Sequence, residues 1–540
     1  MVEVVYSNFS EYLPHILHDI EKAEFIAIDT EFSGLTFSEK EKPSLFDDAD
    51  ARYTKLRQSV SNFTVTQIGL AMFRNTDINK YEVNSYNIFL YPCAFGPVDV
   101  RFSIQASSLG FLCKHSFDFN KCIYNGVSFV NKMQEDEIKK YLSKQDRYIE
   151  IEDFDHSALQ SCCSEVAEWI STAEVGQAMN VDKSYLEDLS EFVIVTEIRE
   201  RFPEGWAISE GGVISVEKVD SEKKTALKQE HKEKEDQKIL RDKIGFTAIF
   251  QKLIEEKKPI MGHNCLMDFL FMYEKFYEPL PKKLSMFKYN NTKLFPEVYD
   301  TKHIVMQLRR IPNFKDEGFL VETSLSNLYN KLEGQKAKHR YLYAPSISHG
   351  EKSKAYEEMH RPHEAGYDAF MVGVVFLRMA HMVASHGVDS SSSKPIPLRK
   401  YLMKMEPHLN KVNIIRAANE YLQLDGPDPA SRRPEWLVVS SRRLTYQLTV
   451  SKLARLFSTY GSLDIHLKSN RQALVALTTF RSKKDILRAF RNHDQILVVQ
   501  YNIWKHSPFI RGAMWTGVAL TGCVIAWSLS GIKTPKILRD

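Results

Sequence analysis

Residues Glu24–Leu35 read EFIAIDTEFSGL, and this stretch decides the fold that we predict for the chain. A short apolar run, Phe25–Ile28, leads directly into Asp29, and Glu31 follows two residues later. An apolar run that ends in charge predicts a buried strand whose end opens on a polar site. Because alternate residues of an extended strand share a face, we expect Asp29 and Glu31 to lie side by side.

Two carboxylates this close repel each other unless a proton or a cation lies between them. With a cation, the pair becomes the floor of a divalent-metal site with oxygen ligands, the kind that Mg²⁺ or Mn²⁺ prefers. The alternative is an acidic strand end that faces solvent. The Asp-x-Glu pattern alone fits both interpretations, so the rest of the chain must decide between them.

The composition is that of an ordinary globular protein. The chain has 540 residues, enough for about two to four domains. Its net charge of +3 excludes a protein that is basic throughout, so any nucleic-acid surface must be local. The seven cysteines have no CxxC spacing, which indicates reduced thiols in the cytosol and no disulfide framework. The N-terminus has no basic region followed by an apolar run, so no signal peptide is expected.

The C-terminal end carries a different signal. Gly512–Ile532 contains 21 residues without a charge, and a helix of that length spans about 31 Å, roughly a bilayer core. Trp515 and Trp527 lie near its ends, and Arg511 and Lys533 flank it. The alternative is a buried C-terminal helix, but the absence of a polar face favours a transmembrane tail anchor. We therefore expect a cytosolic catalytic part held on the mitochondrial outer membrane or the endoplasmic reticulum.

Two further strands, Phe63–Phe73 and Tyr86–Tyr91, are predicted beside the first, as the start of a mixed sheet. Leu35–Asn62 is polar and is predicted as a long surface insertion. Ser107–Val130 interleaves aromatic and basic residues. That pattern fits either a surface that stacks single-stranded RNA or a helix with an ordinary core face.

The remaining composition predicts two smaller units. Residues 156–244 combine an amphipathic segment with the charged run Glu217–Lys243, and we expect a small inserted domain there. Residues 386–400 have the composition of a linker. Residues 401–505, beginning with the strand Lys411–Arg416, alternate strand and helix like a sandwich of the RNA-recognition-motif type. The paired aromatics that stack bases are missing, so a dimer or protein contact is as good an interpretation as base reading.

A third carboxylate follows a second short strand. KPIMGH precedes the helical stretch Asn264–Phe276, and Asp268 lies in its first turns among apolar residues. A carboxylate in such a place is costly unless it is paired or bound to metal, so Asp268 is a candidate ligand. Asp300 competes with it, but its more polar neighbours also fit a simple helix cap.

The motif PHEAGYDAF, which begins at Pro362, supplies the last candidates. His363 and Asp368 are five residues apart and would diverge by about 140° on one helix. Both can reach one site if His363 precedes the helix, which Pro362 and Gly366 allow. His363 is then a candidate general base, with a capping or packing role as the alternative. Glu364 is not expected to take part.

These residues together support a resemblance. Asp29 and Glu31, then Asp268, then His363 and Asp368 occur in the order of the DEDD exonucleases with a His-x4-Asp motif. EFSGL, QIGLAMF, FDFNK, RDKIGF, GHNCLMDF, FYEPLP, YDTKH and HEAGYDA resemble the poly(A)-specific ribonuclease family over about residues 1–385. The C-terminal span is similar to that of a membrane-anchored branch, which shortens precursors of PIWI-interacting RNAs in animal germ cells.

The resemblance implies an α/β chain whose core, residues 1–155 and 245–385, has the RNase H-like DEDD exonuclease fold. The inserted domain, the RNA-recognition-motif-like sandwich and the transmembrane helix 512–532 are added to that core. The implied reaction is 3′→5′ hydrolysis that releases nucleoside 5′-monophosphates. In the family the inserted domain carries an Arg-x3-His signature, whereas this chain has Arg199 and Arg201 without a matching His.

The resemblance also implies the roles of the site residues. Asp29, Glu31 and Asp368 would hold the Mg²⁺, or Mn²⁺, that activates the attacking water. Asp29 and Asp268 would hold the second ion at the leaving 3′-oxygen, and His363 would take the proton.

Three residues and several partners are expected around that centre. Phe32 and Ser33 would pack on the terminal nucleotide, and Asn264 would position the strand. The substrate would be the 3′ end of single-stranded RNA, presented by a PIWI protein on a membrane-bound Tudor-domain scaffold; a homodimer is a further expectation. A membrane-tethered poly(A) deadenylase and a non-catalytic RNA tether are the alternatives, and the presence of all five catalytic candidates argues against the tether.

Overall fold

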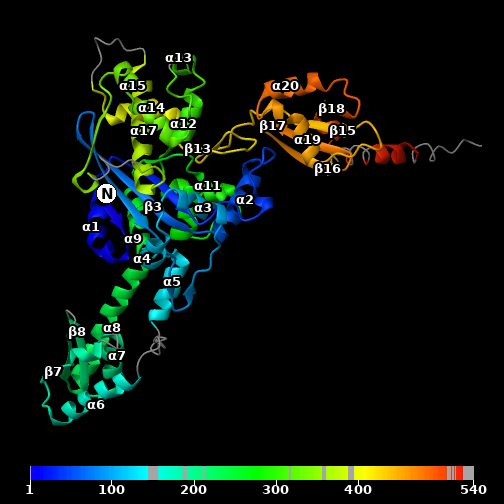
Figure 1. The fold of residues 1–540 in the computed structure, drawn as a ribbon. Helices are drawn as coiled ribbons and strands as arrows, with labels where there is room; N and C mark the ends of the chain where they lie inside the picture. The colour runs from blue at the N-terminus through cyan, green and yellow to red at the C-terminus, as the bar shows by residue number, and fades with distance from the viewer. Residues whose placement is uncertain are drawn as a thin grey trace, which may run out of the picture.

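The computed structural model describes residues 2–143, 156–186, 191–210, 213–315, 318–354, 361–386 and 395–506, together with 513, 516 and 518–526. Figure 1 shows a central α/β body and two smaller units. One small unit lies at the far end of the long helix α8 (Ser221–Ile244), and the other lies close to the C-terminal end of the chain.

The central body is built on a nine-stranded mixed sheet with the path β1-β4-β3-β2-β10-β11-β13-β14, and β12 pairs with β4. Its strands are β1 (Val2–Val4), β2 (Phe25–Phe32), β3 (Val65–Asp77), β4 (Lys80–Phe89), β10 (Ile260–Gly262), β11 (Val298–Asp300), β12 (Ser346–His349), β13 (Lys411–Asn413) and β14 (Tyr421–Gln423). The strand β2 is antiparallel to β3 and parallel to β10. The predicted start of a mixed sheet is therefore confirmed.

Helices cover both faces of this sheet. The helices that pack on one face are α1 (Tyr6–Lys22), α9 (Phe246–Glu256), α10 (Leu266–Met272) and α11 (Leu284–Leu294). Those on the other face are α12 (Thr301–Leu308), α14 (Leu325–Glu333), α17 (Ala365–Ser385) and α18 (Leu398–Met405). In β2, Ile26 and Ile28 enter the first core, and Phe25 and Ala27 enter the second. Burial on both faces explains why this strand is a continuous apolar run.

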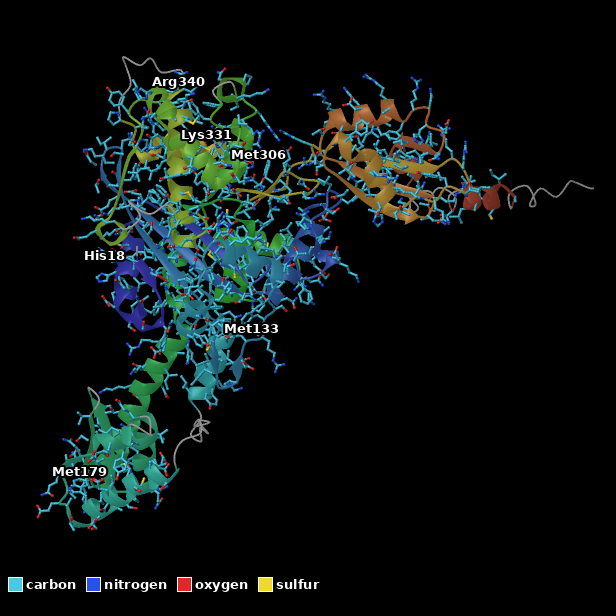
Figure 2. All side chains as sticks on the ribbon, viewed as in Figure 1. His18, Met133, Met179, Met306, Lys331 and Arg340 are labelled. Carbon is cyan, nitrogen blue, oxygen red and sulfur yellow. The ribbon has the colours of Figure 1, made fainter. Side chains whose placement is uncertain are left out.

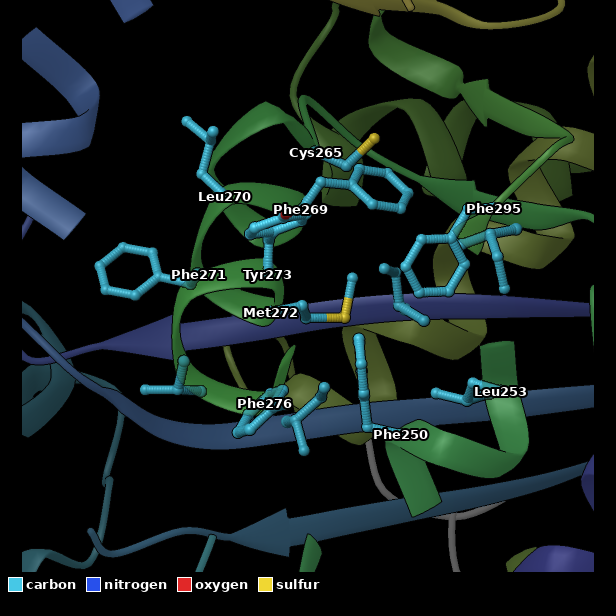
Figure 3. Packing of buried hydrophobic residues seen from close by; sticks show 14 of the residues in the cluster. Phe250, Leu253, Cys265, Phe269, Leu270, Phe271, Met272, Tyr273, Phe276 and Phe295 are labelled. Carbon is cyan, nitrogen blue, oxygen red and sulfur yellow. The ribbon is translucent and has the colours of Figure 1, made fainter. Parts of the chain in front are cut away.

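Aromatic residues pack α10 and the turn that follows it against neighbouring helices, as Figure 3 shows. The rings of Phe269 and Phe295 have centroids 5.4 Å apart, and those of Phe246 and Phe276 are 4.7 Å apart. Such pairs add about 0.5–1.5 kcal/mol each beyond the apolar area that they bury. The helix that carries Asp268 is therefore held rigidly in the core.

The predicted surface insertion Leu35–Asn62 contains a helix, α2 (Ala49–Asn62), which the sequence analysis missed. Asp48 caps it by accepting a hydrogen bond from the backbone N–H of Ala51 at 2.8 Å. Tyr53 and Val60 of this helix are buried in the core of the central body. Short elements follow β4: β5 (Ala94–Phe95), β6 (Val98–Asp99), α3 (Ala106–Lys114), α4 (Phe119–Asn125) and α5 (Lys132–Leu142).

The inserted unit has a core of its own. It contains α6 (His156–Thr172), α7 (Glu191–Arg201) and the antiparallel sheet β7 (Ala178–Asn180), β9 (Val213–Lys218) and β8 (Gly205–Glu210). Met179 marks this unit in Figure 2. The guanidinium of Arg199 lies 4.3 Å from the ring centre of Trp206, and its Nε donates a hydrogen bond to the carbonyl of Ala207 at 2.7 Å. Arg199 therefore serves the packing of this unit.

The C-terminal unit has the element order β-α-β-β-α-β. Its elements are β15 (Leu437–Ser441), α19 (Val450–Phe457), β16 (Leu463–Ser469), β17 (Gln472–Leu477), α20 (Phe480–Ala489) and β18 (Ile496–Gln500), and a short helix α21 (Ile503–His506) follows. The sheet is antiparallel with the order β16-β17-β15-β18. The alternation of strands and helices predicted within residues 401–505 is present from β15 onward, and the structure adds the last strand, β18.

The structure differs from the predicted start of this unit at residue 401. Tyr401 and Met405 of α18 are buried in the same core as α17, and β13 pairs with β11 of the central sheet. Residues 401–423 therefore belong to the central body. The sequence pattern of a strand does not say which sheet the strand will join, and β13 finds its partner in β11.

The C-terminal unit contacts the central body through its sheet and neighbouring residues. The ring of Phe46 lies 5.1 Å from that of Trp436 and 6.2 Å from that of His466 on β16. The carboxylate of Asp464 accepts a hydrogen bond from the backbone N–H of Leu45 at 2.6 Å and pairs with Arg416. A contact within the protein thus occupies part of the surface for which base reading or a protein contact was predicted.

Within the described residues, one helix is long and apolar enough to cross a membrane, and this is α17, which is mostly buried as a core helix is. Part of the predicted span 512–532 lies outside the described residues, as does most of the predicted linker 386–400. Residues 518–526 are helical and exposed, and Val518, Leu520 and Val524 are each more than half exposed.

Candidate active site

Four carboxylates from three elements influence one another at the end of β2. Asp29 and Glu31 lie on β2, Asp268 lies in the first turn of α10, and Asp368 lies in the first turn of α17. The pKa of Asp29 is raised well above its usual range by burial and by the charges of the other three carboxylates. The structure therefore brings together the four acids that the sequence analysis singled out.

Burial is the first cause of the raised pKa at each of the other carboxylates as well. Burial and the charges of Asp368 and Asp268 raise the pKa of Glu31 to about 8. Burial raises the pKa of Asp268 and of Asp368 to about 7. Charges of one sign held in a buried place favour bound protons or a bound cation. At neutral pH this cluster is therefore expected to bind protons or a cation.

The donor set fits divalent metal. All four side chains offer oxygen atoms, and the charged neighbours that raise the pKa of Asp29 and Glu31 are all carboxylates. Oxygen-only sets suit Mg²⁺ and Mn²⁺. In the described part of the chain, no three His, Cys, Asp or Glu side chains already converge as in a finished metal site.

Asp268 and Asp300 have different surroundings. The hydroxyl of Thr30 donates a hydrogen bond to Oδ1 of Asp268. Asp300 is fully buried and accepts from the backbone N–H of Lys302 at 2.8 Å and of His303 at 3.3 Å. Asp300 therefore caps α12, which is the alternative that the sequence left open for it.

The first turn of α17 is held by side chains from two strands. The backbone N–H of Ala365 donates to Oε1 of Gln67 on β3, and that of Gly366 donates to Oδ1 of Asn87 on β4, both at 3.1 Å. These contacts satisfy N–H groups that a helix N-terminus leaves without partners. Neither residue carries a sequence signal for this role, although Gln67 lies in the motif QIGLAMF.

Gly69 allows α17 to lie close to the strand beside Asp29. It pairs with Asp29 across β2 and β3. A Cβ at Gly69 would lie 1.9 Å from the carbonyl oxygen of Ala365, a distance that atoms do not adopt. The absence of a side chain at this position therefore sets how near Asp368 comes to Asp29.

His363 precedes α17, as the spacing to Asp368 required. Its φ of 70° is left-handed, and its backbone N–H donates to Oδ1 of Asp368 at 3.2 Å. Its imidazole lies against His115, with ring centres 3.8 Å apart, and against Phe111 at 5.0 Å. Burial and the charge of His115 lower the pKa of His363. The ring is therefore neutral at pH 7, the form that can accept a proton.

His115 was not singled out as a partner of His363. It follows α3 directly and comes from the segment Ser107–Val130, for which the sequence allowed an aromatic and basic surface or an ordinary helix. The structure shows two short helices there, with Leu112 and Cys122 buried and Phe111 44% exposed. The mixed pattern reflects a segment that packs on one side and borders the site on the other.

The three residues predicted to contact substrate lie in different settings. Phe32 is partly buried, and its ring stacks on Phe271 with centres 4.2 Å apart. Ser33 is 1% exposed; its hydroxyl donates to the carbonyl of Ser103 and accepts from the N–H of Thr64, both at 2.9 Å. The Ser33 side chain therefore offers no open surface to a nucleotide in this structure.

Asn264 lies on the loop between β10 and α10 in a left-handed conformation, with φ 61°. Its backbone N–H donates to Oδ1 of Asp300, and its Oδ1 accepts from Nδ2 of Asn413, at 2.8 and 2.7 Å. Asn264 is partly exposed, so this predicted contact residue does present surface beside the helix of Asp268.

Comparison with known proteins decides the class to which this site belongs. The family model described as CAF1 family ribonuclease matches residues 4–376, more than half of the chain. The chain belongs to this family. It is a DEDD 3′–5′ exoribonuclease and therefore a hydrolase. The alternative of a non-catalytic tether is set aside by this result.

Individual relatives match nearly the whole of this CAF1-family ribonuclease. The mouse poly(A)-specific ribonuclease PNLDC1 is 32% identical over 520 residues, covering 94% of this chain and 95% of that protein. The Bombyx mori pre-piRNA 3′-exonuclease trimmer is 31% identical over 537 residues, covering 96% and 97%. The Xenopus laevis poly(A)-specific ribonuclease PARN is 28% identical, covering 88% of this chain and 77% of that protein.

Among solved structures, S. pombe Pop2p in its Mg²⁺ and Mn²⁺ bound form is similar to this chain. The two share 14% sequence identity with a TM-score of 0.34, and the match covers 72% of this chain and 96% of that one. The family assignment rests on the family model and on the relatives named above.

Proposed function

We propose that this exoribonuclease trims the 3′ ends of PIWI-interacting RNA precursors at a membrane surface. The observation that carries the proposal is the match to the silkworm trimmer, which extends over 96% of this chain and 97% of that protein. The frog PARN, in contrast, is covered over 77% of its length. Agreement over the whole length, including the segments outside the nuclease core, favours the function of the trimmer.

In this proposal Asp29, Glu31, Asp268 and Asp368 hold two Mg²⁺ ions, or Mn²⁺. When bound, the two ions lower the pKa of the attacking water and stabilise the leaving 3′-oxygen. His363 accepts the proton of the water, for which its neutral ring and its backbone link to Asp368 suit it.

Two more side chains bear on the substrate in this proposal. The exposed part of Phe32 supports the terminal base, since an aromatic ring stacks on any base. Asn264 holds the strand at the loop before α10. These contacts read no base identity, which suits an enzyme whose product length is set by another protein.

We further propose that the apolar C-terminal segment anchors the protein in the mitochondrial outer membrane or the endoplasmic reticulum. The exposed apolar side chains of residues 518–526 support this proposal. An anchor raises the local concentration of enzyme for RNA that a PIWI protein carries on a membrane-bound Tudor-domain scaffold. Shortening would then stop where the PIWI protein covers the RNA.

A second candidate is a membrane-tethered poly(A) deadenylase, because the mouse relative carries the name poly(A)-specific ribonuclease. The full chain in detergent with Mg²⁺, given one RNA with an adenosine tail and one with a mixed 3′ end, separates the two. Equal shortening of both, absent in Asp29→Asn, supports trimming. Shortening confined to adenosine favours the deadenylase and overturns the trimming proposal.

A further inference from the structure

A basic cleft lies apart from the four carboxylates. It has a volume of ≈ 350 Å³ and lies between α12 and residues 413–433. Figure 2 labels Met306, one of the residues that line it. Four of its lining side chains are basic, namely Lys302, Arg310, Arg416 and Arg433. Among the described residues that line it, Glu420 alone carries a negative charge.

The cleft is connected by a hydrogen bond to the loop that leads into α10, the helix that carries Asp268. Asn413 lines the cleft, and its Nδ2 donates to Oδ1 of Asn264 at 2.7 Å. Asn264 belongs to the loop that leads into α10 and Asp268. The cleft is therefore linked to the loop that precedes Asp268.

The charges inside the cleft are only partly neutralised. Arg310 and Glu420 form a two-point ion pair, with both N–O distances 2.8 Å, and Arg416 pairs with Asp464 outside the lining. Arg433 donates to the carbonyls of Ala417 and Thr478 at 3.3 and 3.4 Å, which leaves its positive charge unmatched by these partners. An excess of positive charge in a cleft attracts a polyanion.

Apolar surface accompanies this charge. Ile415, which also lines the cleft, is 51% exposed. An exposed apolar side chain beside basic groups suits a single strand, whose bases and phosphates alternate. An acidic peptide would use the charge but would have no reason to continue to Asn264.

We propose that this cleft binds the phosphate backbone of the RNA on the 5′ side of the nucleotide being removed. The site holds several nucleotides of single-stranded RNA without reading their sequence and keeps the shortened strand bound between successive cuts. The inference rests on the exoribonuclease activity of the family and is independent of whether the substrate is a PIWI-interacting RNA precursor or a poly(A) tail.

The competing explanation is structural: the Arg310–Glu420 pair holds residues 413–433 against α12. The two explanations predict different directions of change for the two variants. If the pair is only a brace, neutralising either partner has the same effect. If the cleft binds phosphate, Arg310→Gln removes an RNA contact, whereas Glu420→Gln removes a repulsive charge and releases Arg310.

The test compares Arg310→Gln and Glu420→Gln in the full chain. Arg309→Gln is the matched control, because Arg309 is exposed and adjacent but does not line the cleft. The substrates are an RNA of about 30 nucleotides and a trinucleotide too short to leave the active site, both measured as kcat/KM over a salt series. Thermal denaturation reports how far each variant is destabilised.

We expect Arg310→Gln to lower kcat/KM for the long RNA by about three- to tenfold and to reduce the salt slope by about 0.7. Glu420→Gln should raise kcat/KM, and Arg309→Gln and all trinucleotide rates should stay near wild type. The proposal is overturned if kcat/KM changes equally in the Arg310 and Glu420 variants, or equally for both substrates. It is also overturned if Arg310→Gln leaves kcat/KM unchanged. Trimming of mixed ends is measured separately, so either proposal can fail alone.

Discussion

Two helices of the central body begin beside a buried aspartate, and the two aspartates have different surroundings and different roles. Asp300 precedes α12 and accepts hydrogen bonds from four backbone N–H groups, those of Asn264, Lys302, His303 and Asn413. Asp268 lies within α10, accepts from the hydroxyl of Thr30, and faces other carboxylates. A buried carboxylate surrounded by N–H groups is structural, whereas one surrounded by carboxylates is poised for a cation.

The largest expected effect comes from Asp268→Asn. We expect kcat to fall by about 10³-fold or more, because a residue that acts as part of a catalytic unit is removed. The fold should survive, since the amide avoids the cost of burying a charge, which raises the pKa of Asp268 to about 7. Hydrolysis of labelled RNA and thermal denaturation in EDTA measure the two quantities. A variant with half of the wild-type rate would contradict the assignment of Asp268 to the metal site.

Gly69→Ala should act on the same site from the neighbouring strand. The new methyl group must push Ala365 and the start of α17 away, since the gap to its carbonyl oxygen is 1.9 Å. We expect about 10²-fold lower kcat from misplaced Asp368 and His363, and about 1–3 kcal/mol lower stability from overpacking. Gly110→Ala is the control, because a Cβ there meets nothing within 4 Å. Wild-type kcat in Gly69→Ala would show that this close approach is not required.

Asp300→Asn should act mainly on stability, whereas Asp268→Asn should act mainly on kcat. The amide cannot accept on both sides, so N–H groups of buried residues lose their charged partner. We expect about 2–4 kcal/mol lower stability, seen as a lower urea midpoint whether or not Mg²⁺ is present. If Asp300→Asn instead removes a stabilisation by Mg²⁺, the distinction drawn between the two aspartates fails.

The smallest expected effect is the pH dependence of stability without metal. Carboxylates whose folded pKa is raised bind protons more tightly when folded, so their contribution is full below the unfolded pKa and is lost as pH rises through the folded value. Glu31 and Asp268 place this loss between about pH 4 and pH 8. In EDTA the Tm should therefore fall from pH 6 to pH 8, less so in Asp268→Asn, and Mg²⁺ should raise the Tm most at pH 8. A larger effect of Mg²⁺ at pH 6 would contradict this account.

The candidate site was predictable where its signals are local. Asp29 and Glu31 follow an apolar run, and the five-residue spacing of His363 and Asp368 required the histidine to precede a helix, as it does. The residues that hold this geometry were not predictable. Gln67 reaches Ala365 across 298 positions, and His115 meets His363 from a segment whose pattern fitted two interpretations.

The predicted role of Ser33 shows the limit of transferring a motif. Its place directly after Phe32 suggested contact with the nucleotide. In the fold its hydroxyl joins Ser103 and Thr64, which lie tens of residues away. A small polar side chain next to a site has no local signal that says whether it faces the site or the core.

The sequence by itself determined the acidic end of β2, the order of the five catalytic candidates and the family. These depend on apolar runs and on residue spacing, which can be read from short stretches of the sequence. Only the tertiary structure decided that Asp300 caps a helix, that β13 joins the central sheet, and that Arg310 and Arg433 line one cleft with Asn413. Those outcomes depend on which distant groups meet, and that is settled by the packing of the whole chain, since each polar group takes the partner that the fold brings to it.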